Sequence, residues 1–352
     1  MRRILIACIA SLLLYGAAFG VLLDRPLTLG ALQQRIDGAL SLGAAIEGPK
    51  LVILAGSNGP YSHRCELIGP LIGRPCVNAG VAVGVGLDYL FLRWKTLLRA
   101  GDVVYMPLEE AQYIRGKAAA TLGPDAAIML RHDRASLWQM PPHRQMAALF
   151  SADLRAAIMS LLEATLMAAG FHDPRAEAIG ATNVWGDHIG HTLALAEHNV
   201  AALAAAMPYH PAPMQIASGY GTALVRDFLG WAARHGVTVI GGLPTGFADS
   251  PLDERSENAV RGVYDDGGAA FLALPNRSRY PRAAFFDSPD HLNEPAQIRH
   301  SRAIALALQP LIGPPGEHPV QVVATHPVPT PPRPRWPGNS APAPAGSAPE
   351  PR

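Results

Sequence analysis

The sequence has little charge, and neither sign dominates. Of its 352 residues 16% are charged, and 29 basic residues balance 28 acidic ones to a net charge of +1. No run of lysine and arginine is longer than the pair Arg2-Arg3. A nucleic-acid-binding protein would need a basic surplus or a basic stripe, so we expect no nucleic-acid partner. Hydrophobic residues make up 49% of the chain, enough for the core of one large domain or two small ones.

Cysteine is scarce as well, with three residues in the chain. Cys8 lies in an apolar segment, whereas Cys65 and Cys76 lie close together in the sequence. In an oxidising compartment these two could form a disulfide. Spacing alone does not fix the distance between their Cα atoms, so two separate buried thiols are the alternative.

A long apolar run stands near the N-terminus. Residues 4–23 contain no charged side chain, a length that can cross a bilayer as one helix. The preceding pair Arg2-Arg3 would stay in the cytoplasm. We therefore expect residues 1–23 to anchor a single-pass inner-membrane protein whose globular domain lies in the periplasm. A cleaved signal peptide, with Gly16 and Ala18 at plausible cleavage positions and release to the periplasm, is the alternative.

The rest of the chain divides into three parts. Residues 24–48 form a juxtamembrane segment with a helix expected over about 29–42, and residues 49–313 form the globular domain. From residue 314 to residue 352 the chain is crowded with proline, and later also with alanine, serine and glycine. Such a composition is typical of a disordered tail.

Within the globular domain, short apolar segments alternate with helical patterns. This alternation indicates an α/β fold with a parallel sheet covered on both faces. We predict strands over residues 50–55, 75–81, 103–106, 237–241 and 269–274. We predict helices over residues 63–72, 86–99, 142–169, 215–235 and 294–308. In such sheets ligands collect at the carboxyl ends of the strands.

Two segments far apart in the sequence could meet in a Ser/His/Asp site. Ser57 follows the first predicted strand, and Asp287 and His291 stand just before the last predicted helix. A serine hydroxyl is a poor nucleophile unless a base lies within hydrogen-bond reach and a carboxylate holds the tautomer of that base. We predict Ser57 as nucleophile, His291 as base and Asp287 as the orienting carboxylate, with Asp290 as the rival for that last role. A helix N-cap is the alternative role for Ser57.

The motifs Gly56-Ser57-Asn58 and Phe286-Asp287-x-x-x-His291-Leu292-Asn293 resemble those of the SGNH (GDSL-like) hydrolase superfamily. Their form is similar to a membrane-anchored branch that accompanies polysaccharide O-acyltransferases, some beside cellulose synthase. The resemblance covers about residues 50–310 and implies a three-layer sandwich with a central parallel sheet. Residues of about 110–210 have no counterpart in the small members, so they are expected to form a helical insertion.

The resemblance also implies an oxyanion hole, and here the sequence departs from the family. The expected donors are the backbone N–H groups of Ser57 and of Val83 or Gly84. The family carries an asparagine after its third strand, but this chain has Glu109-Glu110 there. A carboxylate would repel an oxyanion unless it were protonated or turned away. The side chain of Asn183 or Asn58 could substitute.

A second polar cluster follows at Asn183 and Trp185, and continues through Asp187, His188 and His191. A carboxylate and two imidazoles at short spacing could bind a metal, but no cysteine and no evident fourth ligand accompany them. We therefore expect no metal site. The interpretation we adopt is a loop lining the substrate cleft, with Asn183, Trp185 and Asp187 as substrate-binding residues; an ordinary polar turn is the alternative.

The resemblance thus implies a serine esterase or O-acyltransferase that needs no cofactor. Its substrate would be acyl groups, in first place acetyl groups, of an exopolysaccharide such as cellulose. A membrane-bound acyltransferase or synthase would be its partner. The alternative is a non-catalytic SGNH-derived protein that binds glycan or docks on a membrane polysaccharide synthase. The missing asparagine and the proline-rich tail favour that alternative.

Overall fold

The computed structural model describes residues 2–22, 27–149 and 182–312, together with residues 151, 162, 165 and 169. A parallel sheet of five strands forms the centre of the fold, in the order β2-β1-β3-β4-β6. These strands are β1 (Leu51–Ile53), β2 (Cys76–Asn78), β3 (Val103–Met106), β4 (Thr238–Gly242) and β6 (Ala270–Leu272). Each lies within or beside a predicted strand, so the prediction of an α/β fold with a parallel sheet is confirmed.

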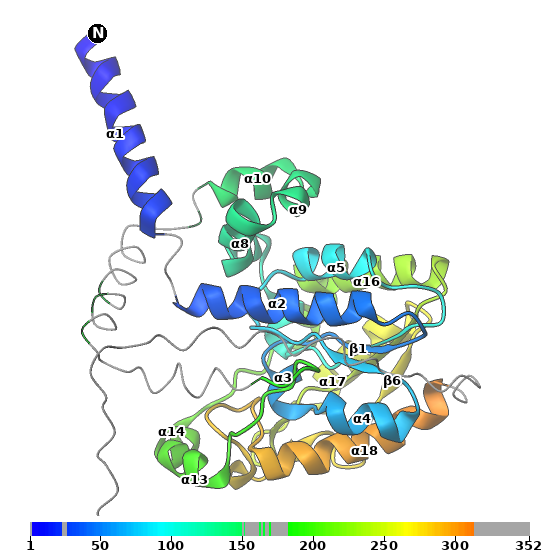
Figure 1. The fold of residues 1–352 in the computed structure, drawn as a ribbon. Coiled ribbons are helices and arrows are strands. Elements are labelled where there is room, and N and C mark those ends of the chain that lie inside the picture. The colour runs from blue at the N-terminus through cyan, green and yellow to red at the C-terminus, as the bar shows by residue number, and fades with distance from the viewer. Residues whose placement is uncertain are drawn as a thin grey trace, which may run out of the picture. The chain divides into compact units, whose positions relative to one another are not determined.

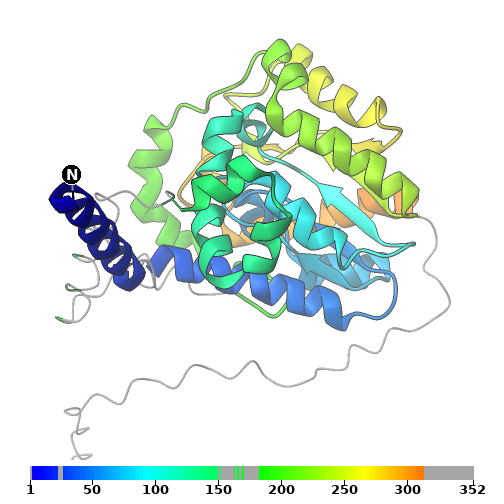
Figure 2. The same cartoon turned by 90° about the horizontal axis from the view of Figure 1, so that it is seen from above.

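Helices cover both faces of this sheet and give a three-layer arrangement (Figures 1 and 2). One face is covered by α2 (Leu27–Ala45), α5 (Leu87–Lys95), α16 (Tyr220–Arg234) and α17 (Glu254–Asp265). The other face is covered by α4 (Cys65–Ile72) and α18 (Glu294–Ile312). Both layers bury side chains of the strands, which explains why β1 and β3 are hydrophobic at every position.

The strand β1 illustrates how the chain supplies both layers. Leu51 and Ile53 pack with the layer of α4 and α18, whereas Val52 packs with the layer of α2, α5 and α16. All three side chains are fully buried. Successive side chains of a strand point to opposite faces of the sheet, so a strand buried on both faces needs an apolar residue at every position.

The remaining elements of the described residues are the N-terminal helix, which has 21 residues, and a number of shorter helices and strands. They are α1 (Arg2–Leu22), α3 (Asn58–Ser62), α6 (Glu110–Ile114), α7 (Lys117–Thr121), α8 (Pro124–His132), α9 (Arg134–Gln139), α10 (Pro142–Ala148), α13 (Leu193–Ala196), η1 (Glu197–Asn199), α14 (Val200–Ala205), α15 (Pro213–Ser218), β5 (Gly246–Phe247), β7 (Arg279–Tyr280) and η2 (Arg282–Ala284). β5 and β7 pair in parallel as a separate small sheet.

The helix predicted over residues 215–235 is divided in the structure. α15 ends at Ser218, and the backbone of Gly219 is extended (ψ 149°) before α16 begins. A Cβ atom at Gly219 would lie 2.1 Å from the carbonyl oxygen of Tyr113, and one at Gly221 would lie 1.8 Å from that of Gln112. The chain therefore bends where α16 approaches the backbone of α6, a contact that only glycine permits.

The described part of the predicted insertion is helical over residues 110–148 (α6 to α10) and 193–205 (α13, η1 and α14), whereas residues 182–192 form a non-helical loop. Within residues 110–148, Gly116, Gly123 and Pro141 stand between consecutive short helices. Arg144 of α10 is buried and forms ion pairs with Asp88 of α5 and with Asp125. This buried ion-pair network attaches the short helices to the layer that covers the sheet. Most of the helix predicted over 142–169 lies outside the described residues.

The N-terminal apolar run is helical, as α1. A bilayer span requires about 20 consecutive and predominantly apolar residues. Within the described ranges of the chain, no helix has both the length and the apolar character to cross a membrane. The predicted single-pass inner-membrane anchor is therefore wrong. The predicted tail at residues 314–352 lies outside the described residues.

The segment at 24–48, expected to precede the globular domain, contributes α2 to it. Ile36, Ala39 and Leu40 of α2 are buried in the core. Nearby, Cys65 and Cys76 form a disulfide whose Cα atoms are 5.0 Å apart. The covalent bond joins the start of α4 to β2, so of the two alternatives for these cysteines the structure has the disulfide.

Candidate active site

The order of the strands creates a topological switch point at the carboxyl edge of the sheet. β1 lies between β2 and β3, so the connection from β1 to β2 runs to one side of β1, and β3 then pairs with β1 on the other side. Ligands of open α/β sheets bind at such a switch point, outside the carboxyl ends of the strands. Ser57 follows β1 and Glu109 follows β3, so both stand at this switch point.

Ser57 and Glu109 are in direct contact. The Ser57 hydroxyl donates to Glu109 Oε1 at 3.3 Å, and the backbone N–H of Asn58 donates to the same oxygen at 3.1 Å. A Cβ atom at Gly56 would lie 2.2 Å from that oxygen, so a glycine is needed before the serine. Glu109 is only 6% exposed. The Glu109 side chain thus lies against the predicted nucleophile.

The predicted base and its carboxylate are also together. His291 Nδ1 lies 2.7 Å from Asp287 Oδ1. Among the hydrogen bonds of the described residues, none joins the carboxyl group of Asp290, the rival partner, to His291; the backbone carbonyl of Asp290 accepts from the hydroxyls of Ser62 (2.9 Å) and Thr245 (2.8 Å). Asp287 is therefore the carboxylate that orients the imidazole.

The helix α3 connects the serine to the histidine. α3 begins directly after Ser57, and its Tyr61 ring stacks on the His291 ring with centroids 4.0 Å apart and planes 8° apart. His291 also lies close enough to Glu109 for its positive charge to favour the ionised carboxylate. Among the contacts of the described residues, no hydrogen bond joins Ser57 to His291; the serine hydroxyl is directed to Glu109 instead.

Carboxyl groups gather around the serine. Burial raises the pKa of Glu109, and the nearby Glu110 adds to the shift, although the Asn58 N–H and His291 oppose it. Burial also raises the pKa of Asp290 well above its usual range, with further contributions from Glu109 and Glu110. Arg279 forms an ion pair with Glu110 at 3.2 Å. The environment therefore favours the neutral form of Glu109 and Asp290.

The predicted donors Val83 and Gly84 lie in the loop after β2, whereas the predicted donor Ser57 follows β1. A Cβ atom at Gly84 would be 3.6 Å from Pro124 and 3.9 Å from the guanidinium of Arg115. The residue of this loop that touches the serine segment is Gly80, where a Cβ atom would lie 2.9 Å from the carbonyl oxygen of Gly56. The assignment of Val83 or Gly84 as a donor stays a prediction.

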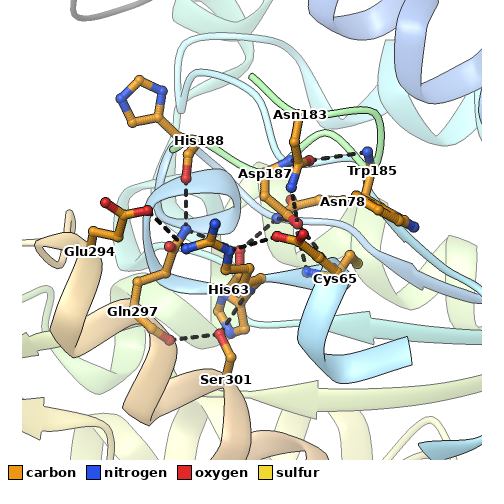
Figure 3. A network of polar contacts seen from close by, with 12 residues as sticks. His63, Cys65, Asn78, Asn183, Trp185, Asp187, His188, Glu294, Gln297 and Ser301 are labelled. Atoms are coloured by element: carbon orange, nitrogen blue, oxygen red, sulfur yellow. Dashed lines mark hydrogen bonds and ion pairs between the residues drawn. The ribbon is translucent and has the colours of Figure 1, made fainter. Parts of the chain in front are cut away.

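The three predicted substrate-binding residues belong to a structural network (Figure 3). Asp187 is fully buried, and its carboxylate accepts from the backbone N–H groups of Cys65 (2.8 Å) and Glu66 (3.0 Å) at the start of α4. The side chains of Asn78 and Asn183 donate to it as well, each at 3.0 Å. Asp187 therefore caps α4 and ties the loop to β2, which leaves it no free oxygen for a substrate.

Asn183 and Trp185 serve the same loop. The side-chain oxygen of Asn183 accepts from the backbone N–H groups of Trp185 and Asp187, both at 3.0 Å. Trp185 packs against the core cluster of α4 and α18. Gly186, with φ +89°, lies so close to the carbonyl of Asn78 that a Cβ atom would be 2.3 Å away. The polar motif is a buried turn that holds the sheet to α4.

The two histidines of that motif surround Tyr61. Ring centroids of His188 and His191 lie 4.1 and 5.5 Å from that of Tyr61. Burial lowers the pKa of His188 to about 3 and that of His191 to about 4, so both are neutral near pH 7. In the part of the chain that the structure describes, no three His, Cys, Asp or Glu side chains are arranged to hold a metal ion. The histidines instead enclose the ring that supports His291.

Sequence reasoning did not place Tyr61 and Arg279 at this site, and it did not foresee that the Glu109 side chain contacts Ser57. The pair Glu109-Glu110 directly after a buried strand could have indicated this site from the sequence. Carboxyl groups at the ligand-binding edge of a sheet are often functional. Tyr61 carried no signal in the sequence.

In comparisons with known proteins, no protein-family model and no curated protein matches the chain.

Proposed function

We propose that the chain is a serine esterase or O-acyltransferase of SGNH type that acts on acyl groups of a polysaccharide. The observation behind the proposal is that α3 links both halves of the site. Ser57 immediately precedes α3 at the switch point of the sheet, and Tyr61 of the same helix stacks on His291, which is paired with Asp287. The polysaccharide and the acyl group are proposed on the resemblance of the motifs alone.

In this proposal His291 is the general base. Asp287 accepts a hydrogen bond from Nδ1–H at 2.7 Å, which fixes the tautomer and leaves the lone pair of Nε2 for the proton of the serine. The Ser57 hydroxyl first turns away from Glu109. Its present contact of 3.3 Å is long for an O–H···O hydrogen bond, so little energy is lost in the turn.

The reaction then proceeds in two halves. Ser57 Oγ attacks the acyl carbonyl carbon, and the alcohol of the polysaccharide leaves with a proton from His291. In the second half water or another sugar hydroxyl attacks the acyl-serine, again with His291 as base. Water as acceptor gives an esterase, and a sugar hydroxyl gives a transferase.

A second candidate function is a non-catalytic domain that binds glycan or docks on a polysaccharide synthase. One specific observation favours it: the Ser57 hydroxyl donates to a carboxyl group rather than to His291. An ionised Glu109 at that place would hold the hydroxyl and repel the oxyanion of an acyl-transfer reaction.

The test is ester hydrolysis by the full chain, with acetylated polysaccharide and 4-nitrophenyl acetate as substrates. We expect Ser57→Ala and His291→Ala to lower the rate by on the order of 10⁴-fold, because members of a triad act as a unit. The matched control is Ser218→Ala, at an exposed serine of α15. Hydrolysis that survives Ser57→Ala contradicts the esterase. Saturable glycan binding without hydrolysis, unchanged by Ser57→Ala, supports the binding module.

A further inference from the structure

Glu109 is held firmly beside Ser57. Its Oε1 atom accepts two hydrogen bonds, from the Ser57 hydroxyl and from the Asn58 N–H. Its own backbone N–H donates to the side chain of Gln112 at 3.0 Å, a capping interaction at the start of α6. The absence of a side chain at Gly56 makes room for the carboxyl group. Both of the hydrogen bonds from Ser57 and Asn58 use Oε1, and among the side-chain hydrogen bonds of the described residues none is made by Oε2.

In the described part of the chain, no lysine or arginine forms an ion pair with this buried carboxyl group. Among the ion pairs of the described residues, Arg279 is engaged with Glu110, and none involves Glu109. The titratable groups that face Glu109 are Glu110 from α6, together with Asp290 and His291 from the loop before α18. An ionised carboxylate that is 6% exposed, beside two other carboxyl groups, would be costly, whereas the neutral acid is not.

We propose that Glu109 is a catalytic residue that acts as a neutral carboxylic acid, whose O–H donates a hydrogen bond to the oxyanion formed on attack by Ser57. This role rests on the proposed function and fills the place of the family's asparagine. Since Oε1 already accepts two hydrogen bonds, the proton belongs on Oε2. A carboxylic acid kept neutral by its surroundings is a strong donor to an oxyanion.

The step balances as follows. The Ser57 Oγ–carbon bond forms, the Ser57 proton passes to His291 Nε2, and the π electron pair of the carbonyl moves to its oxygen. Glu109 Oε2–H donates to that oxygen and keeps its own proton. When the intermediate collapses, the bond from carbon to the leaving alcohol breaks, and His291 returns the proton to the alcohol. Glu109 is therefore neither base nor nucleophile.

The rival role for Glu109 is a base that removes the Ser57 proton, as their hydrogen bond would also permit. Glu109→Gln separates the two roles, because the amide is nearly isosteric and keeps a donor but accepts no proton. We expect Glu109→Ala to lower kcat by about 10²- to 10³-fold, the effect of losing one oxyanion donor, and Glu109→Gln to lower it by only about tenfold. A loss in Glu109→Gln as large as in Ser57→Ala overturns the proposal, and so does full activity in Glu109→Ala.

The pH profile supplies a second readout. The wild type should lose kcat as the pH rises through the pKa of Glu109, because the donor becomes an ionised carboxylate. Glu109→Gln should not lose kcat on that limb. Equal losses in both proteins overturn the proposal even where Glu109→Ala does not fold.

Infrared spectroscopy tests the protonation state without any reaction. The wild-type minus Glu109→Gln difference spectrum at pH 7 should contain the C=O stretch of a protonated carboxylic acid. If this band is absent there but present in the difference with Asp290→Asn, the proton resides on Asp290, and the proposal is overturned. The result holds whether or not the wild type hydrolyses esters, so it is distinct from a failure of the proposed function.

Discussion

His63 is fully buried, and its burial should lower the free energy of unfolding at acid pH. His63 is the C-cap residue of α3, and its imidazole lies edge-on to the rings of Tyr105 and His300, with centroid distances of 5.6 and 4.9 Å. Neither ring nitrogen forms a hydrogen bond with a described residue. Burial lowers the pKa of His63 to about 4, although the carbonyl groups of Asn58 and Gly59 partly oppose the shift.

The sign of the effect follows from where the proton binds. Below a pH of about 6.5 the unfolded chain protonates this histidine, whereas the folded protein does so only near its lowered pKa. The unfolded state therefore binds more protons between these values, and the folded state loses stability as the pH falls. The shift from 6.5 to about 4 corresponds to about 3 kcal/mol, since each pKa unit is worth about 1.4 kcal/mol.

The perturbation is His63→Phe, which keeps an aromatic ring but removes the titration. Urea unfolding of wild type and variant at pH 7.5, 6, 5 and 4 gives the free energy of unfolding of each. The difference at pH 7.5 reports packing alone. We expect the variant to gain about 3 kcal/mol relative to wild type by pH 4. Buried groups that do not contact His63, such as His188 and Asp187, occur in both proteins and cancel. His300 does not cancel, because burial and then the charge of His63 lower its pKa. A difference that does not change with pH refutes the reasoning.

Two further predictions concern the disulfide and the glycine before the serine. Opening the Cys65–Cys76 disulfide, which spans a sequence separation of 11, should lower the free energy of unfolding by about 3 kcal/mol, because it restores loop entropy to the unfolded chain. Urea midpoints of the wild type and of a Cys65→Ala/Cys76→Ala variant measure this, and equal midpoints contradict it. Gly56→Ala places a Cβ atom 2.2 Å from Glu109 Oε1 and should displace that carboxyl group. We expect kcat to fall about 100-fold with circular dichroism unchanged, and unaltered kcat contradicts the geometry.

The sheet could be predicted because its signal is local. β3 was predicted over its full length at residues 103–106, and β1 lies inside the predicted 50–55. Strands buried on both faces need an unbroken apolar run, which a sequence displays directly. The break at Gly219 was missed because it depends on how closely α16 approaches the backbone of α6, a contact between residues about a hundred positions apart.

The site could be predicted only in part, for the same physical reason. Asp287 and His291 are neighbours in one loop, so their pairing was visible in the spacing. The contact of Ser57 with Glu109 depends on the parallel register of β1 and β3, in which Ile53 lies opposite Tyr105. The structural contacts of Asp187 could not be foreseen, because a polar loop has the same composition whether it binds substrate or caps a helix, and burial is seen only in the fold.

The two candidate functions share one fold, and the protonation state of Glu109 decides between them. If Glu109 is ionised, its charge faces an oxyanion that forms on the acyl carbon bonded to Ser57. Two like charges about 4 Å apart repel by about 4 kcal/mol at an effective dielectric constant of about 20. A barrier raised by that amount slows the reaction by about 10³-fold. If Glu109 is neutral, the repulsion is replaced by a hydrogen bond to the same oxyanion. The buried setting with Glu110 and Asp290 favours the neutral form, and this is why we place the enzyme before the binding module.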